Sequence, residues 1–169
     1  MNMNGFEIEH KYLIRYPDHE TLRRYATPSE IVQTYLISET GETDRVRKRG
    51  RGGRFTYTHT RKSWITDLTR VEIEDEISEE DYLSLLKQAD PKRSPVYKTR
   101  WVLPFEGQDF EIDVYPFWSD RAIMELETEN EQQEVHIPDW IQVIREVSGE
   151  IAYSNSSLAL AIPNEKIDS

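Results

Sequence analysis

The chain has 169 residues, no cysteine and a formal net charge of -11 at pH 7. A chain of this length can bury one substantial core, so we expect a single domain. Without cysteine it can form no disulfide and no thiolate zinc site. The acidic balance argues against nucleic-acid binding along the surface, because proteins that do this are normally basic. No signal peptide or membrane-spanning segment is recognisable, so we expect a cytoplasmic protein.

Alternation of polar and apolar residues predicts strands along most of the chain. In chain order, the predicted strands cover 5–14, 31–38, 44–50, 54–62, 69–77, 96–104, 109–115 and 121–129. The third and fourth strands are expected to be joined by a basic, glycine-rich hairpin turn, because Gly50, Gly52 and Gly53 lie between their central residues.

Helices are expected beside these strands. In chain order, the predicted helices cover 17–26, 78–89 and 138–149, and a short closing helix is expected after residue 150. Ser78 is a suitable cap for the second helix, while Pro138 and Gly149 bracket the third. We assign residues 1–162 to one domain and residues 163–169 to a loose C-terminal tail.

Charged residues occupy one face of seven predicted strands, since alternate residues of a strand share a face. These charged faces consist of Glu7, Glu9 and Lys11; Arg45, Arg47 and Arg49; Thr58, Thr60 and Lys62; Glu72, Glu74 and Glu76; Lys98 and Arg100; Glu111 and Asp113; and Glu125, Glu127 and Glu129. Most of these faces carry charge of a single sign. The positive charge is also local, because residues 45–62 hold eight Lys or Arg and no acid.

Two architectures explain such faces. The charged side can be the wet side of an antiparallel sheet or sandwich. Alternatively, the strands can close into a barrel whose charged faces line the interior and whose apolar faces lie under helices outside. The alternation alone slightly favours the first architecture, although single-sign rows count against it.

The ordered set of charged motifs resembles the triphosphate tunnel metalloenzymes, also called the CYTH domain family. "EIEHK" at 7–11 fits the E-x-E-x-K signature of that family. It is followed in order by "RVRKRG", "TRK", "RVEIE", "KTR", "EID", "ELE" and "YSNSSLA", so that the matching motifs span residues 7 to 159. The resemblance implies an α+β, mainly β fold: an eight-stranded antiparallel closed barrel with a charged tunnel and a few helices outside.

The resemblance also implies a role for each matching position. The implied metal ligands are Glu7, Glu9, Glu125 and Glu127. The implied phosphate-binding residues are Lys11, Arg45, Arg47, Lys62, Lys98 and Arg100. Glu72 and Glu74 match the acidic pair that orients water or a second metal. For the reaction itself, we expect Lys98 to stabilise the leaving oxygen, with Lys11 as the alternative. Glu111 and Asp113 match in position without a defined role.

The charge balance of the expected lumen makes metal necessary. The charged faces carry ten acids and, with Arg70 included, eight bases. The net charge of the lumen is therefore negative, and without metal the lumen would not attract a polyanion. Bound divalent cations would reverse this balance, and hard carboxylate ligands suit Mg²⁺ or Mn²⁺.

We therefore expect a metal-dependent hydrolase that removes the terminal phosphate of inorganic tripolyphosphate or a small organic triphosphate. Three alternatives stay open: adenylyl cyclase chemistry on ATP, RNA 5'-triphosphatase activity, and a module that binds triphosphate without turnover. The expected partner is a small-molecule triphosphate rather than nucleic acid or membrane, and a homodimer is compatible with the sequence.

Overall fold

The computed structural model describes residues 5–39 and 41–167. Residues 1–4 of the predicted domain and 168–169 of the predicted tail lie outside the described residues. The elements are, in chain order, β1 (Phe6–Arg15), α1 (His19–Tyr25), β2 (Thr27–Tyr35), β3 (Thr43–Arg51), β4 (Arg54–Trp64), β5 (Thr69–Ile77), α2 (Glu79–Leu85), η1 (Leu86–Gln88), β6 (Val96–Phe105), β7 (Gln108–Val114), β8 (Arg121–Glu127), β9 (Val143–Glu146), η2 (Ile151–Tyr153) and α3 (Asn155–Leu158). None of the described helices is long and apolar enough to cross a membrane.

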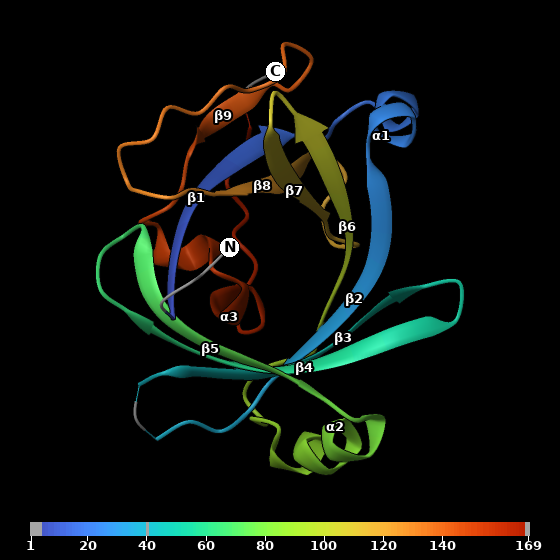
Figure 1. Ribbon diagram of the computed structural model, residues 1–169, viewed down its shortest axis with the longest axis vertical. Coiled ribbons are helices and arrows are strands. Elements are labelled where there is room, and N and C mark those ends of the chain that lie inside the picture. The colour runs from blue at the N-terminus through green and yellow to red at the C-terminus, as the bar shows by residue number, and fades with distance from the viewer. Residues whose placement is uncertain (1–4, 40, 168–169) are drawn as a thin grey trace.

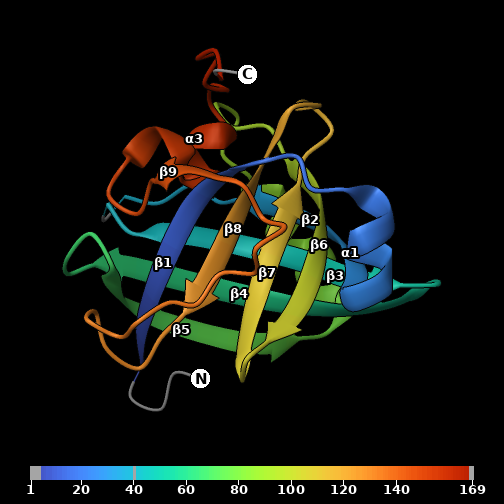
Figure 2. The same ribbon diagram turned by 90° about the horizontal axis from the view of Figure 1, so that it is seen from above.

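Strands β1 to β8 form a closed antiparallel barrel (Figures 1 and 2). The neighbours follow the order β5-β4-β3-β2-β6-β7-β8-β1, and β1 pairs with β5 to close the ring. Closure depends on β1, which pairs with β5 through Phe6–Ile8 and with β8 through Glu9–Arg15. The eight-stranded closed barrel implied by the family resemblance is confirmed, whereas the open sheet or sandwich that the alternation slightly favoured is wrong.

The hairpin between β3 and β4 turns through Gly52 and Gly53. Their φ angles of 63° and 81° lie in the left-handed region, which glycine adopts without steric cost. Two such residues between paired strands form the tight turn that suits the right-handed twist of a hairpin. The basic "RGRGGR" segment is therefore a hairpin turn.

The helix predicted over 138–149 is wrong. Its centre is strand β9, which pairs with β1 from Tyr12 to Ile14. Beyond Ile8 the strand β1 no longer pairs with β5, and this leaves its edge open for β9. The β-branched residues Val143 and Ile144 suit an extended conformation there. Pro138 begins a turn, in which the Ile141 amide donates to the Pro138 carbonyl at 3.0 Å.

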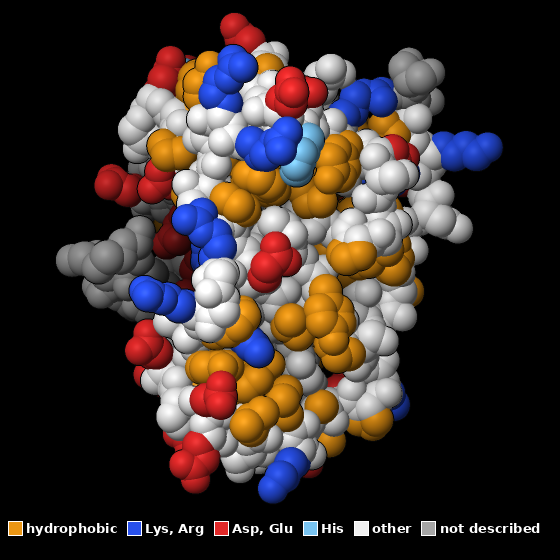
Figure 3. All heavy atoms as spheres, turned by 90° about the vertical axis from the view of Figure 1, so that its right-hand side faces the viewer, with side chains coloured by type: hydrophobic (Ala, Val, Ile, Leu, Met, Phe, Trp, Pro, Cys, Tyr) orange, Lys and Arg blue, Asp and Glu red, His pale blue; other side chains and the backbone are white. Residues whose placement is uncertain are grey.

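The first two predicted helices are confirmed in shorter form and lie outside the barrel (Figure 1). Each begins at a side-chain cap: Asp18 accepts from the Thr21 amide, and Ser78 accepts from the Asp81 amide. Helix α1 and residues 135–141 cover the outer faces of β1, β6, β7 and β8, while α2 and η1 cover β3 and β4. Figure 3 shows that the outer face carrying α1 and β2 mixes hydrophobic side chains with scattered charges.

An apolar layer fills one end of the barrel interior. The layer consists of Leu13, Tyr35, Val96, Tyr115 and Ile123 from the barrel wall, together with Trp118, Val147, Tyr153, Leu158 and Ala159. The last four of these come from the C-terminal segment, which includes η2 and α3. The charged part of the lumen therefore ends at a hydrophobic floor.

Candidate active site

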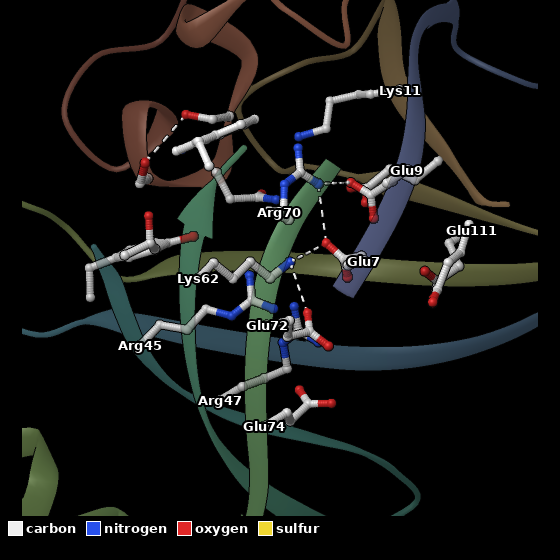
Figure 4. Close-up of a pocket in the computed structure, with 18 of the residues that line it drawn as sticks. Glu7, Glu9, Lys11, Arg45, Arg47, Lys62, Arg70, Glu72, Glu74 and Glu111 are labelled. Carbon is white, nitrogen blue, oxygen red and sulfur yellow. Dashed lines mark hydrogen bonds and ion pairs between the residues drawn. The ribbon is translucent and has the colours of Figure 1, made fainter. Parts of the chain in front are cut away.

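The charged faces of the barrel strands meet in an internal cavity of about 210 Å³. Its lining includes Glu7, Glu9, Lys11, Tyr35, Arg45, Arg47, Arg49, Lys62, Arg70, Glu72, Glu74, Arg100, Glu111, Glu125 and Glu127, so that all eight barrel strands contribute. Figure 4 shows the labelled side chains converging on this space from opposite walls. Every site residue predicted from the sequence lines the cavity except Lys98. Glu76 and Glu129, which share the charged faces, are exposed outside it.

Acidic side chains form two carboxyl pairs on one side of the cavity. Glu9 and Glu125 are 7% and 5% exposed, and their carboxyl groups hydrogen-bond to each other. Burial and the negative charges of Glu125 and Glu7 raise the pKa of Glu9 well above its ordinary value. Glu7 hydrogen-bonds with Glu72 in the same way. Carboxyl groups held this close share a proton or bind a cation.

Lys62 and Arg70 neutralise part of this acidic cluster (Figure 4). Lys62 Nζ lies 2.9 Å from Glu7 Oε1 and 3.2 Å from Glu72 Oε2. Burial would raise the pKa of Glu7, but the charges of Lys62 and Arg70 and the hydrogen bond with Glu72 lower it to about 2. For Glu72, burial and the neighbouring Glu7 outweigh the effect of Lys62 and raise the pKa to about 7.

A second ionic group lies in the wall formed by β6 and β7. Asp113 is completely buried and accepts from Lys98 Nζ at 2.8 Å and from Arg100 Nε at 2.7 Å. Burial opposes ionisation of Asp113, yet the charges of Arg100 and Lys98 lower its pKa to about 2. The Lys98 side chain is itself inaccessible, and burial together with repulsion from Arg100 and Arg47 lowers its pKa to about 7 despite Asp113. The ion pairs of Asp113 with Lys98 and Arg100 therefore stabilise the β6–β7 wall of the cavity.

Three buried cations face the cavity without an acidic partner. Within residues 5–39 and 41–167, no carboxylate oxygen lies within 4.0 Å of the charged nitrogens of Lys11, Arg45 or Arg47. Arg47 Nη2 donates to Gln33 at 3.1 Å, whereas the Nε atoms of Arg45 and Arg47 have no hydrogen-bond partner. Burial and the nearby Arg45 and Arg100 lower the pKa of Arg47 to about 9, so it stays charged at neutral pH. Buried positive charge without a counter-charge favours binding of an anion.

The segment that begins α3 lies across one opening of the barrel in Figure 1, and Ser154, Asn155 and Ser156 line the cavity. Asn155 Oδ1 accepts from the Tyr115 hydroxyl at 2.6 Å and lies 3.5 Å from Lys98 Nζ. The C-terminal segment therefore contributes polar groups to the site as well as the hydrophobic floor beneath it.

Fold and cavity together define a closed antiparallel barrel whose interior is lined by both acidic and basic side chains. The solved structures of a protein called NE1496 share this architecture. In one of them the protein is described as hypothetical, and the match is 31% identical, covers 93% of this chain and 99% of that chain, and has a TM-score of 0.58. In another, NE1496 is described as the inorganic triphosphatase, at 30% identity, 94% and 97% coverage and a TM-score of 0.58. The chain belongs to the triphosphate tunnel metalloenzyme, or CYTH domain, family.

More distant structures share the fold alone. PH1012 from Pyrococcus horikoshii OT3 is 22% identical, covers 75% of this chain and 81% of its own, and has a TM-score of 0.55. HpAC1 from Hippeastrum, described as having a dominant triphosphatase activity, is 15% identical, with 73% and 80% coverage and a TM-score of 0.51. No protein-family model matches the sequence, and no curated protein matches it significantly.

The family implies a divalent metal, and the acidic side of the cavity has suitable chemistry. Among the described residues, no three acidic or histidine side chains are arranged as a complete metal cluster. However, Glu7, Glu9, Glu125 and Glu127 all line the cavity and offer only oxygen donors, which Mg²⁺ and Mn²⁺ prefer. Glu125 Oε1 is buried, has no hydrogen-bond partner within the described ranges and lies 3.8 Å from Arg100 Nη2. The donor set therefore fits a hard divalent cation.

Two features of the site were not assigned from the sequence. Arg70 was counted on the charged face but given no role, although it contacts both Glu7 and Glu9. Asp113 matched a family motif, but its position between Lys98 and Arg100 depends on the pairing of β6 with β7. The alternation predicts which face Arg70 occupies, whereas its two acidic partners become visible only when β1 and β5 are paired.

Proposed function

We propose that this protein hydrolyses the terminal phosphate of inorganic tripolyphosphate or of a small organic triphosphate in the presence of Mg²⁺ or Mn²⁺. The observation that carries this proposal is the internal cavity, in which no carboxylate oxygen of the described residues lies within 4.0 Å of the charged nitrogens of Lys11, Arg45 or Arg47, while several carboxylates line the same space. A binding site with both signs of charge suits an anion that arrives with a metal. The description of NE1496 as an inorganic triphosphatase supports the same reaction.

The size of the cavity favours a compact ligand. Its volume of about 210 Å³ is below the range of roughly 300–1,000 Å³ that is typical of pockets for larger organic ligands. Guanidinium and ammonium groups on several walls can bind the oxygens of successive phosphates and fix a linear chain. An organic group attached to the triphosphate would then extend toward the cavity mouth.

The acidic pair on β5 is suited to orient the attacking water. Glu72 and Glu74 line the cavity, and Thr60 Oγ1 donates to Glu74 Oε1 at 2.9 Å. In the proposed step, the water oxygen bonds to the terminal phosphorus and the bond from that phosphorus to the bridging oxygen breaks. Tripolyphosphate then yields orthophosphate and pyrophosphate. The protein contributes mainly position and charge, as is usual for phosphoryl transfer.

Lys11 is our first choice for stabilising the leaving oxygen, because it lines the cavity and has no carboxylate partner among the described residues. Lys98 instead forms a buried ion pair with Asp113, which stabilises the wall made by β6 and β7. Glu7, Glu9, Glu125 and Glu127 would hold the metal. When bound, a divalent cation offsets phosphate charge and makes water a better nucleophile.

A product assay tests the proposal. Tripolyphosphate, ATP and thiamine triphosphate are supplied separately with Mg²⁺ or Mn²⁺, and the products are identified. We expect orthophosphate and pyrophosphate from tripolyphosphate. Cyclic AMP from ATP would instead indicate a cyclase, and tight binding without any product would indicate a binding module.

Two substitutions on β5 form a matched pair for the same assay. Glu72→Gln should lower kcat by about a hundredfold, since it removes a carboxylate that orients water. Glu76→Gln should leave kcat unchanged, because Glu76 shares the face of Glu72 but lies outside the cavity. Equal kcat values for the two variants would remove Glu72 from the catalytic step.

A further inference from the structure

Arg70 makes an unusual contact with two acids of the site. A single nitrogen, Nη1, lies 3.1 Å from Glu7 Oε1 and 3.2 Å from Glu9 Oε1 (Figure 4). The side chain is only 6% exposed. One cationic nitrogen thus bridges two carboxylates from the same strand.

The surroundings hold this cation in place. Its guanidinium carbon lies 4.3 Å from the centre of the Trp64 ring, so that the indole supports it from the β4 side. The Nε atom is buried and has no hydrogen-bond partner in residues 5–39 and 41–167, which leaves the two carboxylates as the main anchors of the guanidinium group. Among the described residues, Arg70 is also the only cation within 4.0 Å of a Glu9 oxygen.

We propose that Arg70 is a positioning residue that takes the place of a second divalent cation between Glu7 and Glu9, and so limits the acidic cluster to one metal ion. This inference rests on the metal ligands assigned in the proposed function. The positive charge of Arg70 repels a divalent ion from the oxygens that it bridges. Glu125 Oε1 lies 3.8 Å from Arg100 Nη2 but has no hydrogen-bond partner among the described residues, so this oxygen can still bind one ion together with Glu9.

The test is a count of bound Mn²⁺ in the complete protein without substrate, by electron paramagnetic resonance of unbound Mn²⁺. Wild type should bind one Mn²⁺ per chain. Arg70→Gln should bind two, because the competing charge is gone. Arg70→Lys should behave as wild type, since one nitrogen makes both contacts and an ammonium group can replace it. Arg54→Gln, in the exposed β3–β4 turn, controls for net charge.

Several results would overturn the inference. These are two tightly bound ions or none in wild type, a single ion in Arg70→Gln, or a second ion in Arg54→Gln. Circular dichroism checks that each variant is folded. If Arg70→Gln does not fold, the wild-type count and Arg70→Lys still decide the question. Because no substrate is present, absence of triphosphatase activity would refute the proposed function without changing this count.

Discussion

At the residue scale, the cations in the cavity and in its wall are of two kinds. Lys62, Lys98, Arg70 and Arg100 each have a carboxylate partner, and these ion pairs hold the wall together. Lys11, Arg45 and Arg47 make up the other kind and face the cavity without a carboxylate partner in the part of the chain that the structure describes. Alternation in the sequence identified both kinds as inward-facing. The alternation could not show which of these cations have a carboxylate partner, because the partner is set by the pairing of the strands.

Among the residues of the β6–β7 wall, we expect substitution of Asp113 to lower the free energy of unfolding most. Asp113→Asn leaves the buried Lys98 and Arg100 without a full counter-charge, and breaking a buried ion pair in this way costs about 3 kcal/mol in the free energy of unfolding. Asp109→Asn, at an exposed position on the same strand, should cost little. Urea denaturation of both variants measures the difference, and equal stability would show that Asp113 is not essential to the wall.

The same residue predicts a dependence of stability on pH. The pKa of Asp113 is lowered from 3.8 to about 2 in the folded protein. Its contribution is therefore complete above about pH 4 and is lost as the pH falls toward about 2. Between these values the free energy of unfolding should fall by roughly 2 kcal/mol more in wild type than in Asp113→Asn. Parallel pH profiles would contradict this assignment.

At the element scale, the C-terminal third shows where local sequence was insufficient. Trp140, Ile141 and Ile144 have helical spacing, but residues 143–146 form a strand. The decisive factor is the open edge of β1, whose backbone groups need partners and which no local pattern reveals. Packing outside the barrel was predicted correctly for Trp140 and Ile141, which belong to the outer hydrophobic cluster, but Ile144 packs against the apolar layer at the end of the barrel interior.

Helix α3 is short, yet it anchors the floor of the cavity. Leu158 is 4% exposed within the apolar layer, whereas Leu160, two residues later, is 52% exposed. Leu158→Ala should therefore lower the free energy of unfolding by about 3 kcal/mol, and Leu160→Ala should lower it far less. Thermal or urea unfolding of the pair provides the comparison. A similar small effect in both would mean that α3 does not close the barrel.

At the scale of the whole molecule, the fold is a barrel with charge inside and apolar faces covered outside. The sequence predicted the strands and the charged faces, and the family resemblance predicted closure. The apolar floor was not predicted, although Leu13 and Ile123 continue the same faces as Lys11 and Glu125. Leu13 and Ile123 form the floor only because the C-terminal segment packs against them, and this long-range contact is not visible in the local sequence.

The central claim is that one enclosed cavity binds a short phosphate chain together with metal. A crystal structure with tripolyphosphate and Mn²⁺ tests it most directly. The account predicts the phosphates inside the barrel, in contact with Lys11, Arg45 and Arg47, and Mn²⁺ at Glu9 and Glu125. Tripolyphosphate bound only on the outer surface, with the cavity cations still without an anion, would contradict it.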